Sequence, residues 1–281
     1  MAKIRLHTAS RVLLAATAAA LCAATAQATT PLADQPVFSN TAVPGNLALA
    51  LSVEFPTAVS VAHVANTYAS ATIYMGYFDP KKCYLYSWNA TETLRHFYPA
   101  GAATNQTCAT STKWSGNFLN WATMQTIDPF RAVLTGGYRA LDTTSITLVE
   151  KAWASGQGGT GNFPNRNLGS SALVSSSTPF NWSALNMRIQ GLGNKMRLTR
   201  TGNLNGTPVD YTGAAVTDGT VYEVSVRVKV CDTSAGAGPL EANCTAYPNS
   251  GSEIYKPTGL LQQYAAKIRY SAFGYLNDSN I

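Results

Sequence analysis

Charged side chains and histidines are scarce in this chain. Asp, Glu, Lys and Arg make up 12% of its 281 residues, and three residues are histidine. No long run of lysine and arginine occurs, so the formal net charge of +6 does not indicate a nucleic acid partner. Few side chains are available as a general base. Because the sequence also lacks a Gly-x-Ser-x-Gly motif and a phosphate loop ending in Gly-Lys-Ser/Thr, we do not expect an enzyme.

Long apolar runs are absent beyond the N-terminus. Residues 1–28 begin with basic residues at positions 3, 5 and 11, continue with VLLAATAAALCAATA and end in Ala-Gln-Ala. This is the pattern of a secretory signal peptide with its cleavage site. The apolar string is shorter than the roughly 20 residues that span a membrane. We therefore expect residues 29–281 to be exported, to the periplasm or the outer surface, without a membrane span.

Cysteines are few, and an even number follows the signal: Cys83, Cys108, Cys231 and Cys244. In an oxidising compartment an even number favours disulfides, and four cysteines allow three pairings. Short polar segments between Cys83 and Cys108 and between Cys231 and Cys244 favour these two sequential pairs. Zinc is not expected, because Cys-x-x-Cys spacing is missing.

Hydrophobic spacing predicts a mixed α/β fold. We predict strands over residues 46–55, 138–142, 187–189, 195–201 and 221–231, a pair of strands within 71–88, and a returning strand after residue 268. Helices are predicted over 60–68, 144–154, 257–268 and 118–133. In the last one Pro129 predicts either a kink or two helices, the second beginning near Asp128 as its N-cap. The Gly- and Ser-rich residues 156–179 predict a mobile loop.

Aromatic residues are concentrated between positions 74 and 98. Exposed tyrosines serve well at interfaces because they combine apolar area with a hydroxyl group. Alternate residues of a strand face the core, so about half of these aromatics should be buried. The candidate binding surface consists of Tyr74, Tyr77, Phe78, Tyr84, Tyr86 and Trp88. Within this stretch, Asp79-Pro80 is typical of a turn rather than of a ligand loop.

Four strings cover much of the chain: YMGYFDPKKCYLYSW from Tyr74, WSGNFLNWATMQTIDPFRAVLTGGYRALDTTSITLVEKAWASGQG from Trp114, RIQGLGNKMRLTRTG from Arg188, and KPTGLLQQYAAKIRYSAFGYLNDSN from Lys256. Together they resemble the N-terminal region of PilY-type proteins, which accompany type IV pili. The resemblance implies a role in pilus biogenesis, twitching motility and pilus-tip adhesion, by binding to pilin, minor pilins and host or abiotic surfaces. It also implies a C-terminal β-propeller, where calcium binds. We expect this chain to be truncated before that propeller and to hold no cofactor.

Members of that family often carry a von Willebrand factor A-like domain with an Asp-x-Ser-x-Ser metal motif after the first strand. Here the strand at residues 46–55 ends in Ser52-Val53-Glu54 instead. We therefore expect a degenerate von Willebrand factor A-like α/β fold with β-rich insertions and no metal. Two other functions stay open. The tyrosines and tryptophans are also typical of a periplasmic carbohydrate-binding or carbohydrate-processing module, and the abrupt end is typical of a nonfunctional gene remnant.

Overall fold

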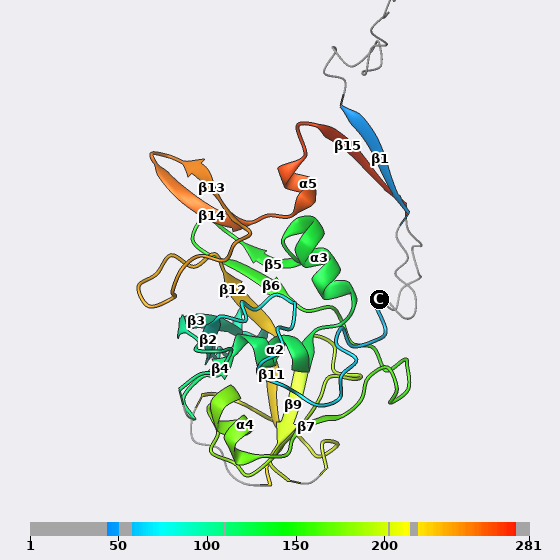
Figure 1. Cartoon of the computed structure of the whole chain (residues 1–281), viewed down its shortest axis with the longest axis vertical. Coiled ribbons are helices and arrows are strands. Elements are labelled where there is room, and N and C mark those ends of the chain that lie inside the picture. Colours follow the sequence, from blue (N-terminus) through cyan, green and yellow to red (C-terminus); the bar gives the residue numbers. More distant parts are fainter. Residues whose placement is uncertain (1–43, 51–57, 110, 202, 214–218, 274–281) are drawn as a thin grey trace, which may run out of the picture. The chain divides into compact units, whose positions relative to one another are not determined.

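The computed structural model describes residues 44–50, 58–109, 111–201, 203–213 and 219–273, and the fold is given for these (Figure 1). The predicted signal peptide at residues 1–28 and the segment Ser52-Val53-Glu54 lie outside the described residues. None of the helices in the described part of the chain has the length and apolar character that a membrane span requires.

Two sheets form the centre of the described fold. The six-stranded sheet has the order β4-β2-β3-β12-β6-β5, and the five-stranded sheet has the order β10-β11-β9-β8-β7. Their strands are, in chain order, β2 (Lys82–Ser87), β3 (His96–Ala102), β4 (Trp114–Ser115), β5 (Arg139–Asp142), β6 (Thr147–Glu150), β7 (Arg166–Leu168), β8 (Leu185–Arg188), β9 (Lys195–Thr199), β10 (Val209–Asp210), β11 (Tyr222–Ser225) and β12 (Arg227–Val230). Within these sheets only β3–β12 and β10–β11 are parallel among the described residues.

The broad prediction of a mixed α/β fold is confirmed, with two disulfides and a large share of β-structure. The finer prediction of a von Willebrand factor A-like fold is not confirmed. Most neighbouring strands of the two sheets run antiparallel. Antiparallel neighbours need only short connections, whereas parallel neighbours need a crossover of a dozen or more residues.

The segment predicted as one strand over residues 221–231 forms two strands that belong to different sheets. β11 pairs with β9 in the five-stranded sheet, and β12 pairs with β6 in the six-stranded sheet. At the junction, the Val226 amide donates to the Asn194 carbonyl (2.8 Å) and the Val226 carbonyl accepts from the Lys151 amide (3.2 Å). This segment therefore joins the two sheets, and Val224, Val226 and Val228 are all buried.

Of the two alternatives for residues 118–133, two helices are confirmed, but the N-cap of the second is Thr126 and not Asp128. α2 (Gly116–Thr123) begins after Ser115, whose side chain accepts from the Phe118 amide, and α3 (Ile127–Thr135) ends at Gly136 in the left-handed conformation. All residues of α2 are buried, so this short helix fills the interior rather than covering it. Two further short helices are α4 (Ser171–Ser177) and α5 (Leu260–Gln263), and η1 (Glu92–Leu94) is a 3-10 turn.

Several local predictions are wrong. Residues 144–154 contain strand β6 instead of a helix, because Leu148 and Val149 are buried in the middle of a sheet. No helix forms over 60–68, and of the two strands predicted within 71–88 only β2 exists. The supposed loop at 156–179 contains β7 and α4. α4 escapes detection because a helix of serines and few apolar residues has no clear periodicity; its N-cap Ser170 accepts from the Leu173 amide.

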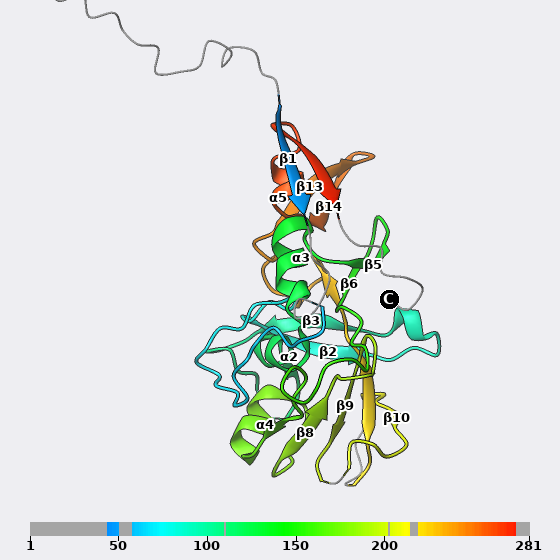
Figure 2. The ribbon, with the colours of Figure 1, turned by 90° about the vertical axis from the view of Figure 1, so that its right-hand side faces the viewer.

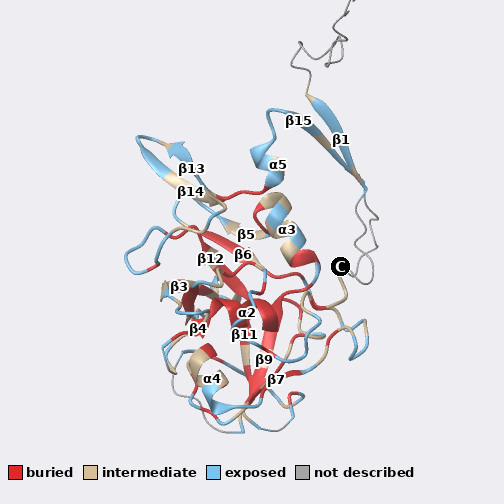
Figure 3. Cartoon of the chain, viewed as in Figure 1, coloured by how far each residue is buried: buried red, intermediate tan, exposed pale blue. Residues whose placement is uncertain are grey.

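Aromatic side chains make up much of the hydrophobic core. Figure 3 shows α2 and the strands at the centre of the fold largely in the colour of buried residues. Trp114 stands at the centre of this core, with edge-to-face contacts to Phe97 (5.7 Å between ring centroids) and Phe180 (5.2 Å). Phe180 in turn stacks on Trp182 at 4.2 Å. Such contacts stabilise a fold by about 0.5–1.5 kcal/mol each beyond the burial of apolar area. The aromatic abundance of the sequence is thus used largely for packing.

Two pairs of strands lie outside the central sheets. β13 (Cys244–Asn249) and β14 (Ser252–Pro257) form a largely exposed antiparallel hairpin, and β1 (Gly45–Ala50) pairs in parallel with β15 (Ile268–Phe273). α5 lies between β14 and β15 in sequence and packs on α3, as Figures 1 and 2 show. The predicted helix at 257–268 is therefore shortened to α5, while the predicted returning strand is confirmed as β15.

Candidate functional site

Two buried asparagines of α2 hold the loop that precedes β2. The Asn117 side chain accepts from the Tyr74 amide (2.9 Å) and donates to the Thr72 carbonyl (2.8 Å). Asn120 accepts from the Phe78 amide (3.0 Å) and donates to the carbonyls of Tyr74 (2.8 Å) and Phe78 (2.7 Å). One turn of helix separates the asparagines, so both point to the same side. They fix the course of residues 72–78 without any secondary structure there.

The Asp79-Pro80 segment forms a tight turn directly after this loop. Asp79 accepts from the Lys81 amide through its side chain (2.8 Å) and from the Lys82 amide through its carbonyl (3.0 Å). A Cβ atom at Gly116 would lie 2.2 Å from the Asp79 carbonyl oxygen, so only glycine allows α2 to begin so close to the turn. The prediction of a turn is confirmed. The turn leads Lys82 and Cys83 into the start of β2.

Both predicted disulfides are present in the structure. Cys83 is joined to Cys108 and Cys231 to Cys244, with Cα–Cα distances of 5.8 and 5.6 Å. The first bond ties the start of β2 to the loop after β3. The second bond ties the end of β12 to the first residue of the β13–β14 hairpin.

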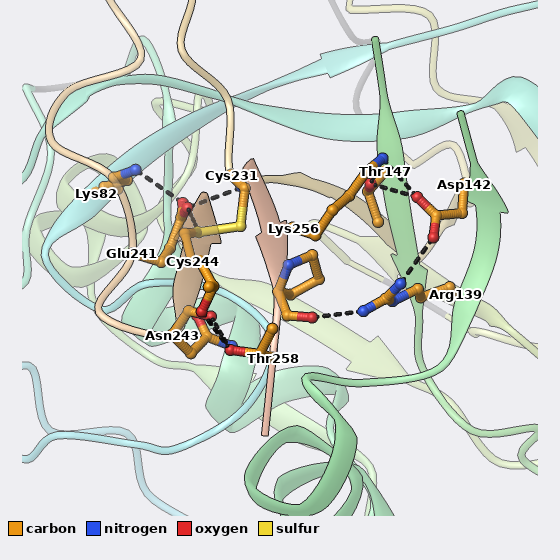
Figure 4. The surroundings of a disulfide bond; sticks show 12 residues. Lys82, Arg139, Asp142, Thr147, Cys231, Glu241, Asn243, Cys244, Lys256 and Thr258 are labelled. Atoms are coloured by element: carbon orange, nitrogen blue, oxygen red, sulfur yellow. Dashed lines mark hydrogen bonds and ion pairs between the residues drawn. A yellow bond between two sulfur atoms is a disulfide. The ribbon is translucent and has the colours of Figure 1, made fainter. Parts of the chain in front are cut away.

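A buried glutamate links the turn to the second disulfide (Figure 4). One carboxylate oxygen of Glu241 accepts from the Lys82 ammonium (2.7 Å), and the other accepts from the Cys231 amide (2.9 Å). Lys82 is 2% exposed and the Glu241 side chain is 10% exposed. A buried ion pair fixes geometry well when each charge has its partner, because removing one partner leaves the other uncompensated. Glu241 and Lys82 were not among the predicted site residues.

The base of the β13–β14 hairpin is also bonded to β5 and β6 of the six-stranded sheet (Figure 4). Lys256 donates to Asp142 (2.6 Å) and to the Thr147 hydroxyl (2.9 Å), while Arg139 donates to the Pro257 carbonyl (2.6 Å) and to Asp142 (2.8 Å). Burial alone would raise the pKa of Asp142, but the hydrogen bonds from Lys256, Thr147 and Arg139 outweigh it and lower the pKa. The carboxylate is therefore stabilised as an anion.

The loop before β2 and the segment before β13 border a pocket of about 850 Å³, which we name the disulfide pocket. One wall is the loop at residues 76–82, another is the segment 239–243 beside the Cys231–Cys244 bond, and residues 102–106 form a third. Its volume is in the range of ligand sites, about 300–1,000 Å³. Apolar atoms make up most of its lining, and two of its charged groups, Lys82 and Glu241, bind each other.

The predicted aromatic surface is wrong for five of its six residues. Tyr74, Tyr77, Phe78, Tyr84 and Tyr86 are between 1% and 8% exposed. The physical reason differs between the residues on β2 and the residues in the loop before it. Tyr84 and Tyr86 alternate on β2 toward the core, whereas the other three belong to the loop that the asparagines draw under α2. Tyr77 and Phe78 still contribute atoms to the wall of the disulfide pocket.

Trp88 is the one exposed member of that predicted surface, at 41% exposure. The Arg95 guanidinium lies over its ring at 5.4 Å, and its indole nitrogen donates to Asp210 at 3.4 Å. Arg95 also forms an ion pair with Asp210 (2.7 Å). The tryptophan is therefore held in a small polar cluster rather than in an aromatic platform.

The part of the chain that the structure describes contains one group of potential metal ligands, Cys231, Glu241 and Cys244, with ligand atoms within 4.8 Å of one another. The two sulfur atoms are bonded to each other and are not thiolates, which are the form that binds metal. Asp128 is buried as well, but its oxygens accept from the amides of Gln125 (2.9 Å) and Ala152 (2.7 Å). It stabilises the start of α3, two positions after the N-cap Thr126.

Comparison with known proteins gives one family. Residues 65–209 match the family model described as "PilY1 homolog, small alpha/beta domain". Two relatives from Xylella fastidiosa (strain Temecula1), each described as a type IV pilus biogenesis factor PilY1 homolog, are 47% identical over 260 residues and 27% identical over 244 residues. These alignments cover 88% and 73% of this chain, but the chain spans only 21% and 15% of the relatives. No solved structure matches.

Proposed function

This chain belongs to the family of PilY1 homologs, and we propose on that basis that it acts in type IV pilus biogenesis as an exported binding protein, not as an enzyme. The name of its 47% identical relative supports a pilus role at the level of the family. The two disulfides support export, because such bonds persist in oxidising compartments. We further propose pilin and minor pilins as partners, with adhesion to host or abiotic surfaces as a consequence of a position at the pilus tip.

We assign the contact with a pilus subunit to the disulfide pocket. Three features support this assignment: its size, its rigid walls and its apolar interior. The Cys231–Cys244 bond, the Lys82–Glu241 pair and the buried Asn120 hold separate walls in place. Rigid walls lower the entropy lost on binding. An apolar side chain of a pilus subunit, inserted between residues 76–82 and 239–243, fits this chemistry.

A binding role also agrees with the side chains around the pocket. Among the described residues that line it, none is a histidine, serine or free cysteine. Lys82 and Glu241 neutralise each other at 2.7 Å, and of the other two charged residues in the lining, Asp79 accepts from the Lys81 amide within the turn. A general base or nucleophile needs a free, activated group in the cleft. The pocket offers apolar contact area instead, which favours binding over bond cleavage.

The single observation that carries the proposal is the pocket itself. The proposal can be tested by placing a large side chain in the pocket. Ala242 lines the pocket and is exposed, so Ala242→Arg blocks the entrance without burying a charge. The matched control is Ala235→Arg, an exposed alanine of the same connection outside the pocket. Both variants are introduced into the complete gene in a strain that forms pili, and surface pili are counted by electron microscopy.

We expect Ala242→Arg to weaken binding at the pocket by about 1.4 kcal/mol or more, which is a tenfold loss of affinity, and to reduce the number of surface pili clearly below that of the parent strain. Ala235→Arg should leave the number of pili unchanged. Secretion of each variant and formation of both disulfides are checked on non-reducing gels. Normal piliation with a secreted, disulfide-bonded Ala242→Arg protein would rule out this pocket as the contact.

A carbohydrate-binding module is the second function predicted from the aromatic residues. The burial of Tyr74, Tyr77, Phe78, Tyr84 and Tyr86 removes the observation that favoured it, because a ring must be exposed to stack on a sugar. Of the six residues of the predicted aromatic surface only Trp88 is exposed, at 41%, and it already contacts Arg95 and Asp210. The exposed rings of Trp153 and Tyr138 belong to other parts of the chain. We therefore do not favour this function.

A further inference from the structure

β1 and β15 form a parallel pair whose faces are exposed. Residues Gly45–Ala50 pair in register with Ile268–Phe273, and Figure 3 shows both strands in the colour of exposed residues. Leu47 is 43% exposed and Phe273 is 64% exposed. Parallel sheets are almost always buried on both faces, and an isolated pair of strands is marginally stable in water. The pair, which carries Leu47, Leu49, Ile268 and Phe273, therefore lacks the cover that parallel strands usually have.

The elements next to this pair also expose large apolar side chains. α5 packs on α3, and a single turn joins α5 to β15, with the Ile268 amide donating to the Tyr264 carbonyl at 2.9 Å. We define the β1–β15 surface by the large apolar residues on these elements and on that turn that are more than 40% exposed: Leu47, Phe130, Val133, Leu260, Tyr264 and Phe273. α3 and α5 pack on each other and α5 leads into β15, so these side chains lie on elements that follow one another.

Part of this surface is rigidly attached to the rest of the fold. A Cβ atom at Gly259 would lie 2.3 Å from the backbone of Leu134, so α5 begins in direct contact with the end of α3. The Gln262 amide group donates to the Thr135 carbonyl (3.1 Å) and accepts from the Gly259 amide (2.9 Å). The short helix is therefore anchored and presents Leu260 from a fixed position.

The relatives indicate what covers the surface. This chain spans 21% of the relative with 47% identity, so most of that relative lies outside the matched region. A segment of the same polypeptide reaches the surface at a high effective concentration and does not pay the entropy of bringing two molecules together. We infer that in a complete family member the polypeptide outside the matched region adds a β-strand to an open edge of the β1–β15 pair and covers its faces with apolar side chains.

This arrangement has a consequence for the position of the disulfide pocket. Residues 51–267 connect β1 to β15, which are direct neighbours in the sheet. The whole body that contains the pocket would then be an insertion between two adjacent strands of a larger sheet. Such an insertion is attached at two closely spaced points. The inference does not depend on what the pocket binds.

Hydrogen exchange tests the inference directly. The 281-residue chain is compared with a chimera in which this chain replaces the matched region of the 47% identical Xylella relative. We expect the amides of residues 45–50 and 268–273 to exchange at least about 100-fold more slowly in the chimera, because a covered strand opens only with its surroundings. The complete natural relative and its isolated matched region provide the same comparison at the aligned strands, whether or not the chimera folds.

Variants test whether slower exchange in the chimera depends on the β1–β15 surface. The double variant Leu47→Asp/Phe273→Asp should abolish the slower exchange in the chimera and shift the melting temperature of the 281-residue chain by less than about 2 °C. Val64→Asp is the matched control, because Val64 is 88% exposed and lies on another loop; it should keep the slower exchange. Equal exchange in both proteins would overturn the inference. So would protection that grows with concentration in the 281-residue chain, since a second copy would then be the occupant.

Discussion

Replacing Asn120 by alanine removes three hydrogen bonds that hold the loop before β2. The side chain is fully buried, accepts from the Phe78 amide and donates to the carbonyls of Tyr74 and Phe78. Alanine can replace none of these bonds, and the loop has no sheet or helix that would take up its free groups. The Asn120 amide also fills the space beside Gly76, where a Cβ atom would lie 2.2 Å from its oxygen.

The expected loss can be worked out from these contacts. A buried polar group left without a partner costs about 1–3 kcal/mol, and neighbouring effects do not add fully. For three such groups we expect Asn120→Ala to lower the free energy of unfolding by about 3–5 kcal/mol. A domain has about 5–15 kcal/mol in total, so the variant should still fold at low temperature. Residues 76–79 line the disulfide pocket, so the binding that we propose for this pocket should weaken too.

Urea unfolding of the oxidised chain, followed by tryptophan fluorescence, measures this loss. Asn167→Ala is the matched control, because Asn167 is exposed on β7; its effect should stay within about 0.5 kcal/mol. The m-value should be unchanged if both states keep their compactness. A loss below about 1 kcal/mol for Asn120→Ala would refute the reasoning that this asparagine holds the loop.

Three further predictions concern other parts of the fold. Replacing Cys231 and Cys244 together by serine should lower the free energy of unfolding by about 2–4 kcal/mol in urea unfolding. Reducing agent should then destabilise the variant less than the native chain, and an unchanged urea midpoint in the variant would contradict this. Burial lowers the pKa of Lys151 to about 8, so above that pH the unfolded state binds more protons than the folded state. The free energy of unfolding should therefore rise between pH 8 and 9.5 in the native chain but not in Lys151→Met. Gly136→Ala should cost at least about 1 kcal/mol, because φ is +82° and a Cβ atom would lie 2.6 Å from the Pro257 carbonyl; thermal unfolding would detect it.

The local chemistry of the chain determined several features in advance. Cysteine spacing predicted both disulfides, because short loops bring their ends together at a small entropic cost. Asp79-Pro80 predicted a turn, since proline restricts the backbone at its own position and the aspartate side chain accepts from an amide two residues later. The resemblance to PilY-type proteins rested on four stretches of the sequence, and the match of residues 65–209 to the family model confirmed it.

Contacts between distant segments decided the rest. Val221 to Cys231 reads as one alternating strand, yet Val226 bonds to Asn194 and Lys151, and these long-range partners divide it between two sheets. The burial of the aromatic residues in the loop before β2 likewise depended on Asn117 and Asn120, which lie more than 40 residues further along the chain. The Lys82–Glu241 pair joins residues 159 positions apart. Periodicity reports the environment of neighbours along the chain, whereas burial and pairing depend on which segments meet in space, so the pocket was visible only in the tertiary structure.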